Sequence, residues 1–391
     1  MKRRHVALIY DASLPYDVQV INGIGTYAHQ VGNWSVFIEE FALRNQRLPE
    51  LRTWKGDGIL ADFDDPKVAA AVRSLPMPVV GFGGGYGWHD PSTRIPYFAT
   101  DNQAIAKLAA DHLLDRGFRR FAFCGFPKSR INGWSEERAS AFKQCIREAG
   151  FGCSIFTGPH FAAQQWAAMQ RALCRWLSSL PKPLGLMACN DKRARHVLEA
   201  CRTLGAQVPD EVAVVGVDND VMLCQLADPP LTSVQQGTRR LGYEAAALLD
   251  QLMAGKKTPR LKFSIAPEQV VNRRSSDVLA VEDTLVAQLI RFIREHATEG
   301  AKVSDVVKAM RRSRTTLETR LQSIIGRTIH DEIRRVQIDQ ARRLLSTTDL
   351  ALKQVAASAG FASVQYMTTL FSQQFGQTPA QYRKQSRALP R

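Results

Sequence analysis

The chain has 391 residues, of which 45% are hydrophobic and 23% charged, so it has room for two or three domains with the composition of an ordinary globular protein. Its formal net charge is +15, and the last quarter, from Leu285 onward, holds 18 Lys and Arg against 8 Asp and Glu. Such a basic segment favours a nucleic-acid partner over a merely solvated cationic surface.

The seven cysteines are an odd number and are scattered without a C-x-x-C pair. This spacing predicts buried thiols in a reducing cytoplasm, with no disulfide framework and no zinc site. The apolar run at residues 6–10 has the length of a strand and is followed by Asp11, so it is neither a signal peptide nor a membrane span. We therefore expect a cytoplasmic protein without a metal, a cofactor or a membrane contact.

Apolar runs of strand length alternate with helical stretches over the first part of the chain. Strands are expected at residues 5–10, 34–39, 58–62, 78–81 and 96–100, with helices at 18–30, 66–73 and 103–116. The pattern then starts again, with strands at 121–125, 184–189 and 212–217 and helices at 136–149, 164–180 and 191–204. Continuous apolar strands alternating with helices predict parallel βα units, here arranged as two similar lobes.

The last part of this α/β region connects the two lobes again. A segment at 229–234 leads back, a helix is expected at 241–253, and a closing strand ends at 270–271. We expect the chain to cross between the lobes near residues 116, 232 and 259, and the lobes to enclose a cleft that closes on a small ligand. The periodicity stops briefly after residue 276, which predicts a first domain at 1–276 and a linker at 277–284.

Five short motifs in this region carry a family resemblance. They are Asp101-Asn102, Arg138-Ala139-Ser140-Ala141-Phe142, Cys189-Asn190-Asp191, Val215-Gly216-Val217-Asp218-Asn219 and Pro229-Pro230-Leu231-Thr232-Ser233-Val234. In order and spacing they resemble the sensor domain of the LacI/GalR family and the periplasmic sugar-binding proteins. The resemblance implies a type I periplasmic-binding-protein fold and a sugar ligand, while the DNA-binding headpiece of that family is missing from the N-terminus.

A sugar presents vicinal hydroxyl groups, so its site needs carboxylates, amides or a guanidinium group that can bind two of them at once. The candidates at strand ends and helix starts are Asp101, Arg138, Asn190 and Asp218, and the rings that could cover an apolar sugar face are Tyr16, Phe82, Tyr86 and Trp134. A single Asp after a strand is more often a helix cap, but four such positions together favour a sugar site. Tyr16, Phe82 and Tyr86 could equally be packing residues.

The glycine-rich stretch at 81–87 invites a nucleotide-binding interpretation. No G-x-G-x-x-G register is complete in it, and the Trp88-His89-Asp90-Pro91 run that follows does not open a helix. No P-loop, nucleophile elbow or metalloprotease motif occurs elsewhere. A sugar- or DNA-modifying enzyme with a helical appendage therefore stays as the remote alternative, and no catalytic residue is predicted.

The C-terminal region, 285–391, predicts two helix-turn-helix motifs, at 303–325 and 352–374. In each, apolar residues at i, i+3 and i+4 mark a buried face, and a turn separates two short helices. Gly360 supplies the second turn, and Arg311 and Arg312 occupy the first. A long helix at about 329–345 acts as a rigid spacer, so that the two motifs could enter successive major grooves about 34 Å apart.

The outward faces of the two second helices are the expected DNA-reading surfaces. The first offers a basic residue, a carboxylate and two hydroxyl groups, and the second offers small uncharged hydrogen-bonding groups. The predicted DNA contacts are Arg314, Thr315, Glu318, Thr319, Ser363, Gln365, Thr368, Thr369 and Gln373. The alternative for either motif by itself is an ordinary pair of packed helices.

The final hundred residues resemble the AraC/XylS family of transcription regulators. The residues that carry the resemblance are Leu352, Val355-Ala356, Gly360-Phe361, Tyr366, Phe371, Phe375-Gly376, Thr378-Pro379 and Tyr382-Arg383. Two positions depart from the pattern. Gln337 stands where the spacer helix of many members has a basic residue, which puts one phosphate contact in question, and Met367 replaces a usual Phe.

A sugar sensor placed ahead of an AraC-type domain resembles a group of sugar-responsive transcription activators, and the effector that this resemblance implies is D-xylose. It also implies double-stranded operator DNA as a partner, a contact with RNA polymerase and a homodimer. The alternative is a regulator or repressor that responds to another pentose or to a hexose.

Overall fold

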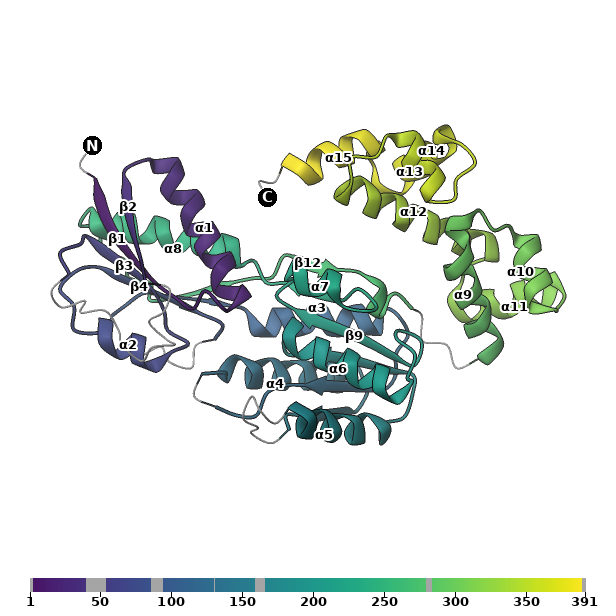
Figure 1. Ribbon diagram of the computed structural model, residues 1–391, viewed down its shortest axis with the longest axis horizontal. Coiled ribbons are helices and arrows are strands. Elements are labelled where there is room, and N and C mark those ends of the chain that lie inside the picture. Colours follow the sequence, from purple (N-terminus) through teal and green to yellow (C-terminus); the bar gives the residue numbers. More distant parts are fainter. Residues whose placement is uncertain are drawn as a thin grey trace. The chain divides into compact units, whose positions relative to one another are not determined.

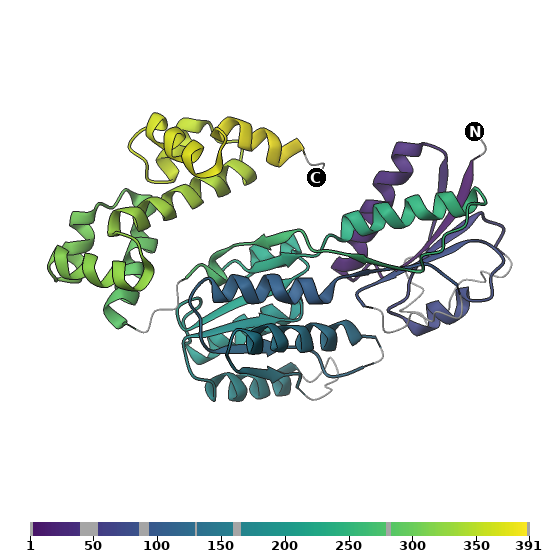
Figure 2. The ribbon, with the colours of Figure 1, turned by 180° about the vertical axis from the view of Figure 1, so that it is seen from behind.

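The computed structural model describes residues 3–39, 54–85, 94–129, 131–158, 166–278 and 283–388 (Figures 1 and 2). The chain forms two compact units that divide between Val278 and Leu279, inside the predicted linker. The first unit holds two six-stranded sheets, and the second is entirely helical. The predicted fold class is confirmed.

The first sheet has the strand order β11-β5-β4-β3-β1-β2, and all its pairs are parallel. Its strands are β1 (Arg4–Ile9), β2 (Trp34–Glu39), β3 (Gly58–Asp62), β4 (Val79–Gly83), β5 (Tyr97–Thr100) and β11 (Lys262–Ile265). Helices α1 (Pro15–Val31) and α8 (Thr238–Met253) pack with one face of this sheet, and α2 (Pro66–Val72) packs with the other. Buried, β-branched and aromatic strand residues explain why the runs read as continuous apolar segments.

The second sheet has the order β12-β10-β9-β8-β6-β7, with one antiparallel pair, β10 with β12. Its strands are β6 (Phe121–Cys124), β7 (Cys153–Phe156), β8 (Leu184–Ala188), β9 (Val212–Val217), β10 (Thr232–Gln235) and β12 (Gln269–Val271). The helices of this lobe are α3 (Asn102–Leu114), α4 (Gly133–Glu148), α5 (Trp166–Ser178), α6 (Asp191–Leu204) and α7 (Val221–Leu226). A short 3₁₀ helix, η3 (Arg274–Ser276), follows β12 and packs on β9 and β10.

The three crossings between the lobes differ from the predicted positions near 116, 232 and 259. Helix α3 packs on α4 and on the second sheet, so the first crossing comes before it, next to Asp101. Helix α8 packs on α1 and on the first sheet, so the second crossing comes after β10, at Gln236 and Gly237. The third lies between β11 and β12. Periodicity predicts a helix but not the sheet that the helix covers, which explains the difference.

Helices α1 and α8 approach each other closely because each has a glycine at the crossing. A Cβ atom on Gly23 would lie 2.0 Å from the Arg239 carbonyl oxygen, and one on Gly242 would lie 2.0 Å from the Val20 carbonyl oxygen. Any larger side chain would separate the helices. Figures 1 and 2 both show the two helices side by side on the first sheet.

The second unit consists of two small helical cores that share one long helix, α12 (Ile329–Thr347). The first core contains α9 (Thr284–His296), the 3₁₀ turn η4 (Ala297–Glu299), α10 (Val303–Met310) and α11 (Arg314–Ile325). The second contains α13 (Leu352–Ser358), α14 (Val364–Phe375) and α15 (Pro379–Ala388). Both predicted helix-turn-helix motifs are present, with Ser313 and Ser363 capping α11 and α14.

The apolar spacing of α11 predicts that Leu317, Leu321 and Ile324 point inward. Leu317 and Leu321 are buried, but the prediction for Ile324 is wrong: the residue is 42% exposed, and Ile325 packs against the first core instead. The helix ends at Gly326, whose positive φ of 68° turns the chain toward α12. No helix in the described ranges is long and apolar enough to span a membrane.

Candidate functional site

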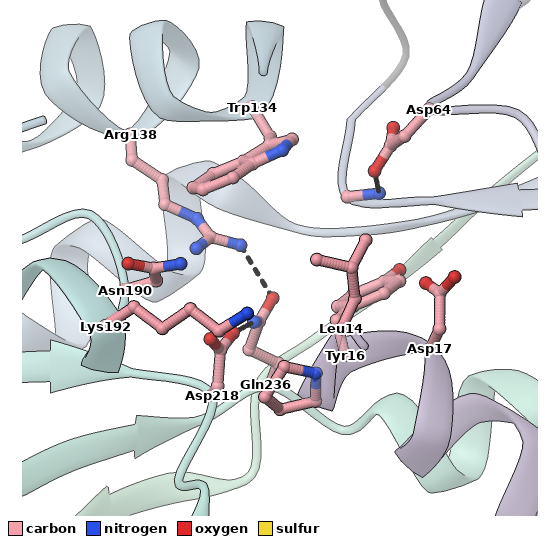
Figure 3. Close-up of a pocket in the computed structure, with 12 residues that line it drawn as sticks. Leu14, Tyr16, Asp17, Asp64, Trp134, Arg138, Asn190, Lys192, Asp218 and Gln236 are labelled. Atoms are coloured by element: carbon pink, nitrogen blue, oxygen red, sulfur yellow. Dashed lines mark hydrogen bonds between the residues drawn. The ribbon is translucent and has the colours of Figure 1, made fainter. Parts of the chain in front are cut away.

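A polar pocket lies where the loops after several parallel strands of both sheets meet. It encloses about 440 Å³, with its open mouth included, and is lined by Leu14, Pro15, Tyr16, Asp17, Asp64, Gly84, Trp134, Arg138, Asn190, Lys192, Asp218 and Gln236 (Figure 3). The first-lobe residues come from Leu14, the start of α1 and the loops after β3 and β4. The others come from α4, the start of α6 and the loops after β8, β9 and β10. The carboxyl ends of parallel strands are the usual place for a ligand in such sheets.

Arg138 organises the second-lobe wall of the pocket. Its Nε donates to Asn102 Oδ1 at 2.8 Å, its Nη1 to the Cys189 carbonyl at 2.7 Å and its Nη2 to Gln236 Oε1 at 2.7 Å. The guanidinium lies over the Trp134 ring, 4.8 Å from the centroid. Because the whole residue is 2% exposed, these bonds fix the guanidinium plane before any ligand arrives.

Asp218 is linked to Arg138 through Gln236, whose Nε2 donates to Asp218 Oδ1 (Figure 3). Arg138 therefore acts on this carboxylate through the Gln236 amide, which lies between the two side chains. Burial raises the pKa of Asp218 to about 6, against the opposing effect of Arg138. The backbone at Asp218 and Asn219 has φ values of 110° and 52°, a strained conformation that proteins keep mainly at functional sites.

Acidic residues form the first-lobe wall. Asp64 accepts a hydrogen bond from the Gly84 backbone nitrogen at 2.7 Å, and its pKa is raised to about 7, chiefly by burial. Asp17 accepts from the Asp11 backbone nitrogen at 2.8 Å, and burial raises its pKa as well. Tyr16 directs its hydroxyl group to the Gly83 carbonyl at 2.6 Å. This wall therefore presents acceptors that can also hold a proton.

Hydrogen bonds join the lobes beside the pocket, among them the bond from Asn102 Nδ2 to the Gly84 carbonyl at 2.7 Å and the following two. Gln19 Nε2 of α1 donates to the Asp218 carbonyl at 3.1 Å, and Lys192 Nζ donates to the Ser13 carbonyl at 3.1 Å. These last two bonds connect a loop or helix of the first lobe with a residue at or next to the second-lobe wall. A ligand-dependent movement of one lobe would therefore change the contacts of α1 and of the loop before it.

The pocket gathers five of the eight predicted ligand residues: Tyr16, Trp134, Arg138, Asn190 and Asp218. The structure does not bring Asp101 or Phe82 into it. Asp101 caps α3, with its carboxylate accepting from the Ala104 nitrogen at 2.9 Å, and Phe82 is fully buried in the core of the first sheet. Tyr86 lies outside the described residues.

Sequence reasoning missed four polar pocket residues: Asp17, Asp64, Lys192 and Gln236. A usable signal existed for two of them. Asp64 comes two residues after β3, and Gln236 comes directly after β10, in the same relation to its strand as Asp218 has to β9. Lys192 follows the predicted Asn190 motif, but nothing in its spacing separates it from a solvated lysine.

The chemistry of the pocket suits a small, uncharged, hydroxyl-rich ligand. Carboxylates, amides and a guanidinium offer paired donors and acceptors, and the Trp134 ring offers an apolar face. The described part of the chain contains no cluster of His, Cys, Asp and Glu that could hold a metal ion. The seven cysteines are free thiols; Cys124, Cys189, Cys201 and Cys224 are buried, and Cys145, Cys153 and Cys174 are half-buried.

The outward face of α11 differs in one respect from the prediction. Arg314, Thr315 and Thr319 are exposed, as a DNA-reading face requires. Glu318, however, accepts a hydrogen bond from the Ile329 nitrogen at 3.0 Å and lies 3.7 Å from Arg314 Nε. It therefore holds the start of α12 and one face of Arg314, a structural use that the sequence did not reveal.

On α14, Gln365, Thr369 and Gln373 are exposed and Thr368 is half-buried. Ser363 is also exposed but acts as the N-cap, accepting from the Tyr366 nitrogen at 3.2 Å. The missed neighbour is Tyr366, 37% exposed, with Arg334 of α12 lying 4.8 Å from its ring centroid. The sequence singled out Tyr366 only as part of the AraC/XylS resemblance, so its exposure on this face was not predicted.

Two α/β lobes around a polar pocket, followed by two helix-turn-helix motifs on one spacer helix, define a sugar-sensing transcription regulator. Family models match in the same order: XylR N-terminal domain at 5–103, periplasmic binding protein-like domain at 110–276 and helix-turn-helix domain at 306–385.

Relatives match along the whole chain. The xylose operon regulatory proteins of Escherichia coli K12 and of Haemophilus influenzae are each 37% identical to it, covering 98% and 97% of this chain and 97% of each relative. The solved structure of the xylose-binding transcription activator XylR superposes with a TM-score of 0.74 at 36% identity, covering 98% of both chains. The chain belongs to the family of xylose operon regulatory proteins.

Proposed function

We propose that the protein is an activator of D-xylose catabolism genes that binds D-xylose in the pocket between its lobes. The observation that carries this proposal is the connected set of Arg138, Gln236 and Asp218 facing Asp64 across the pocket. A pentose has several adjacent hydroxyl groups and no charge, so it can satisfy both walls at once. The relatives whose names refer to xylose share this chain's full length.

The two walls have different tasks in this proposal. The fixed guanidinium of Arg138 and the amides of Asn190 and Gln236 donate to hydroxyl oxygens, while Asp218 and Asp64 accept from hydroxyl protons. Trp134 covers an apolar face of the ring. Closure of the lobes on the sugar excludes water, which strengthens every one of these bonds.

The remaining parts of the proposal concern the assembly. The protein acts in the cytoplasm as a homodimer, reads paired half-sites of double-stranded DNA and contacts RNA polymerase. Sugar binding shifts the dimer between two arrangements that present the helix-turn-helix pairs differently. Sedimentation of the full chain with and without xylose tests the dimer, which fails if the protein sediments as a monomer at micromolar concentration under both conditions.

A thermal-shift screen of pentoses and hexoses tests the choice of sugar, because a ligand that binds only the folded state raises the unfolding temperature. D-Xylose should give the largest shift at equal concentration. A larger shift with another pentose or with a hexose would show that this other sugar is the effector, and the protein would still be a sugar-responsive regulator.

Proton NMR of the sugar after long incubation tests the enzymatic alternative, since a sensor returns the sugar unchanged.

A further inference from the structure

Gln337 lies in α12 between the two cores of the helical unit. Its neighbour Val336 belongs to the first core and Ile338 to the second. The side chain is buried, with 7% of the residue exposed. Its Nε2 group donates to the Ala297 carbonyl at 3.0 Å and to the Gly360 carbonyl at 2.9 Å.

These two carbonyls come from different halves of the helical unit, where each half is one core with its helix-turn-helix motif. Ala297 ends α9 in the first half, and Gly360 forms the turn between α13 and α14 in the second. Carbonyls at helix ends lack intrahelical partners, and a buried carbonyl without a hydrogen bond destabilises the fold. A side chain that donates to both carbonyls therefore removes this penalty in both halves. The amide nitrogen of Gln337 carries two N–H groups, so this one side chain can donate to both carbonyls.

The main chains of the two halves also touch at this point. Gly360 has a φ of 80°, and a Cβ atom there would lie 2.3 Å from the Ala297 carbonyl oxygen and 3.0 Å from Gln337 Nε2. A side chain at position 360 would therefore push the halves apart. The contact is a second connection between the cores, beside the shared helix α12.

We infer that Gln337 is a positioning residue that fixes the separation and orientation of α11 and α14, and thereby the spacing of the two base segments that the domain can read. This inference rests on the proposed DNA-binding function. The resemblance to the AraC/XylS family implies a basic residue that contacts a DNA phosphate at this position. In this chain the buried amide of Gln337 donates both N–H groups to carbonyls of the protein itself.

The test measures the distance between the halves in the full chain without DNA. Nitroxide labels on genetically encoded ketone residues at Gln322 and Gln374, both exposed, avoid the seven native cysteines. Double electron–electron resonance should give a narrow distribution for the parent. Gln337→Leu keeps the volume but removes both donors, and Gln337→Asn keeps an amide too short to reach both carbonyls. Both should lose the narrow distribution.

The matched control is Gln340→Leu, three residues along the same helix, where the amide oxygen accepts from Arg343 within α12. It should keep the narrow distribution. If Gln337→Leu lowers the unfolding temperature but leaves the distribution unchanged, Gln337 only stabilises the fold and the inference is overturned. Gln337→Asn decides the matter if the Leu variant does not fold.

A second readout separates this inference from the proposed function. The operator is one selected for tight binding by the parent protein. Inserting one base pair between its two contacted segments should lower the operator affinity of the parent by about tenfold or more, comparable to the loss of a matched base pair. Gln337→Asn should show a clearly smaller loss. Absence of DNA binding by the parent would refute the proposed function, while an equal spacing penalty in both proteins would refute the role of Gln337.

Discussion

Asp218 is the pocket residue whose carboxylate is most directly connected to the other polar groups of the second-lobe wall. It is buried, it accepts from Gln236, and through Gln236 it is connected to Arg138. We predict that Asp218→Ala weakens D-xylose binding by about 2–5 kcal/mol, because truncating one member of a buried polar set leaves its partner unpaired. Calorimetry measures the loss.

Asp101→Ala is the matched control for this prediction. Asp101 caps α3 outside the pocket, so the variant should lose about 1 kcal/mol of unfolding free energy and keep its sugar affinity. Undiminished xylose binding by Asp218→Ala would refute the site, and parallel loss of binding to random DNA would indicate misfolding instead.

A second prediction at this scale follows from Asp64. Its carboxyl has a pKa near 7 in the folded protein against an ordinary value of 3.8, so between these pH values the folded chain holds a proton that the unfolded chain releases. Stability must therefore fall as pH rises through this window, by roughly 1–3 kcal/mol for a partly buried group. Asp64→Asn removes the charge and should raise the unfolding temperature at pH 8 but not at pH 4.

Thermal unfolding of the parent and of Asp64→Asn at the two pH values measures this effect. An equal difference in unfolding temperature at pH 4 and pH 8 would show that Asp64 carries no such charge penalty. Asp218 contributes a smaller effect of the same sign, since its pKa is also raised, to about 6; both proteins share it, so it cancels from the comparison.

How much of the pocket the sequence predicts depends on the kind of residue. Arg138, Asn190 and Asp218 stand in motifs whose order reveals a family. Asn190 and Asp218 also follow strands closely, whereas Arg138 lies within α4 and only its motif indicated it. Asp101 has the same local signature, but it caps α3 and does not line the pocket. Only the three-dimensional path of the chain separates a capping Asp from a ligand Asp, because both come directly after a strand.

At the scale of elements, the two DNA-reading helices have different chemistry. Arg314 is an exposed cation in the first turn of α11, while α14 presents Gln365, Thr369 and Gln373. We predict that Arg314→Ala weakens operator binding by about 1–3 kcal/mol and relaxes preference at one base position, as loss of a bidentate guanine contact does. Equal losses on operator and random DNA would make Arg314 a phosphate contact.

Glu318 complicates the same experiment in a way that can be controlled. It pairs with Arg314 and accepts from the Ile329 nitrogen, so removing Arg314 could disturb the junction between α11 and α12. Arg314→Gln keeps a long polar side chain beside Glu318. If Arg314→Gln and Arg314→Ala lose specificity equally while the unfolding temperature is unchanged, the loss belongs to base reading.

Element boundaries were predictable where caps and periodicity agree. Ser313 and Ser363 cap α11 and α14, and α12 begins at Ile329, where the spacer helix was predicted to start. What periodicity could not reveal is which buried face a residue joins: Ile324 and Ile325 are equally apolar, and only the second faces the core. The bridging role of Gln337 was hidden for the same reason, since its partners lie 40 and 23 residues away.

At the scale of the whole molecule, the pocket must communicate with the segment that leaves the sensor. Asn219, next to Asp218, accepts from Arg273 Nη2 at 2.7 Å, and Arg273 Nη1 donates to the Leu231 carbonyl at 2.8 Å. Arg273 leads into η3, where Ser275 donates to the Val214 carbonyl at 2.6 Å. This strap, residues 273–278, ends at Val278, the last residue of the first unit.

The strap is also held on its other side by α3. Ser276 lies 2.8 Å from His112 Nε2, and Arg116 Nε donates to the Ser276 carbonyl at 2.8 Å. Burial lowers the pKa of His112 to about 3, so the imidazole stays neutral near neutral pH and these bonds do not depend on small pH changes. Asn219, with its positive φ of 52°, is the part of this network next in sequence to the pocket residue Asp218.

We therefore predict that Arg273→Ala uncouples sugar from DNA without abolishing either interaction. The ratio of operator affinities with and without xylose, which a typical coupling of about 1–3 kcal/mol would place between roughly 5 and 150, should fall toward one. Xylose affinity and binding to random DNA should change little, because Arg273 does not line the pocket and lies outside the helical unit.

Arg274→Ala, at the exposed next residue, is the control and should keep the ratio. Fluorescence anisotropy on operator DNA, with calorimetry on the same preparations, measures all three quantities. An unchanged ratio in Arg273→Ala, or an equal fall in both variants, would remove the Asn219–Arg273 bond from the route between the two units.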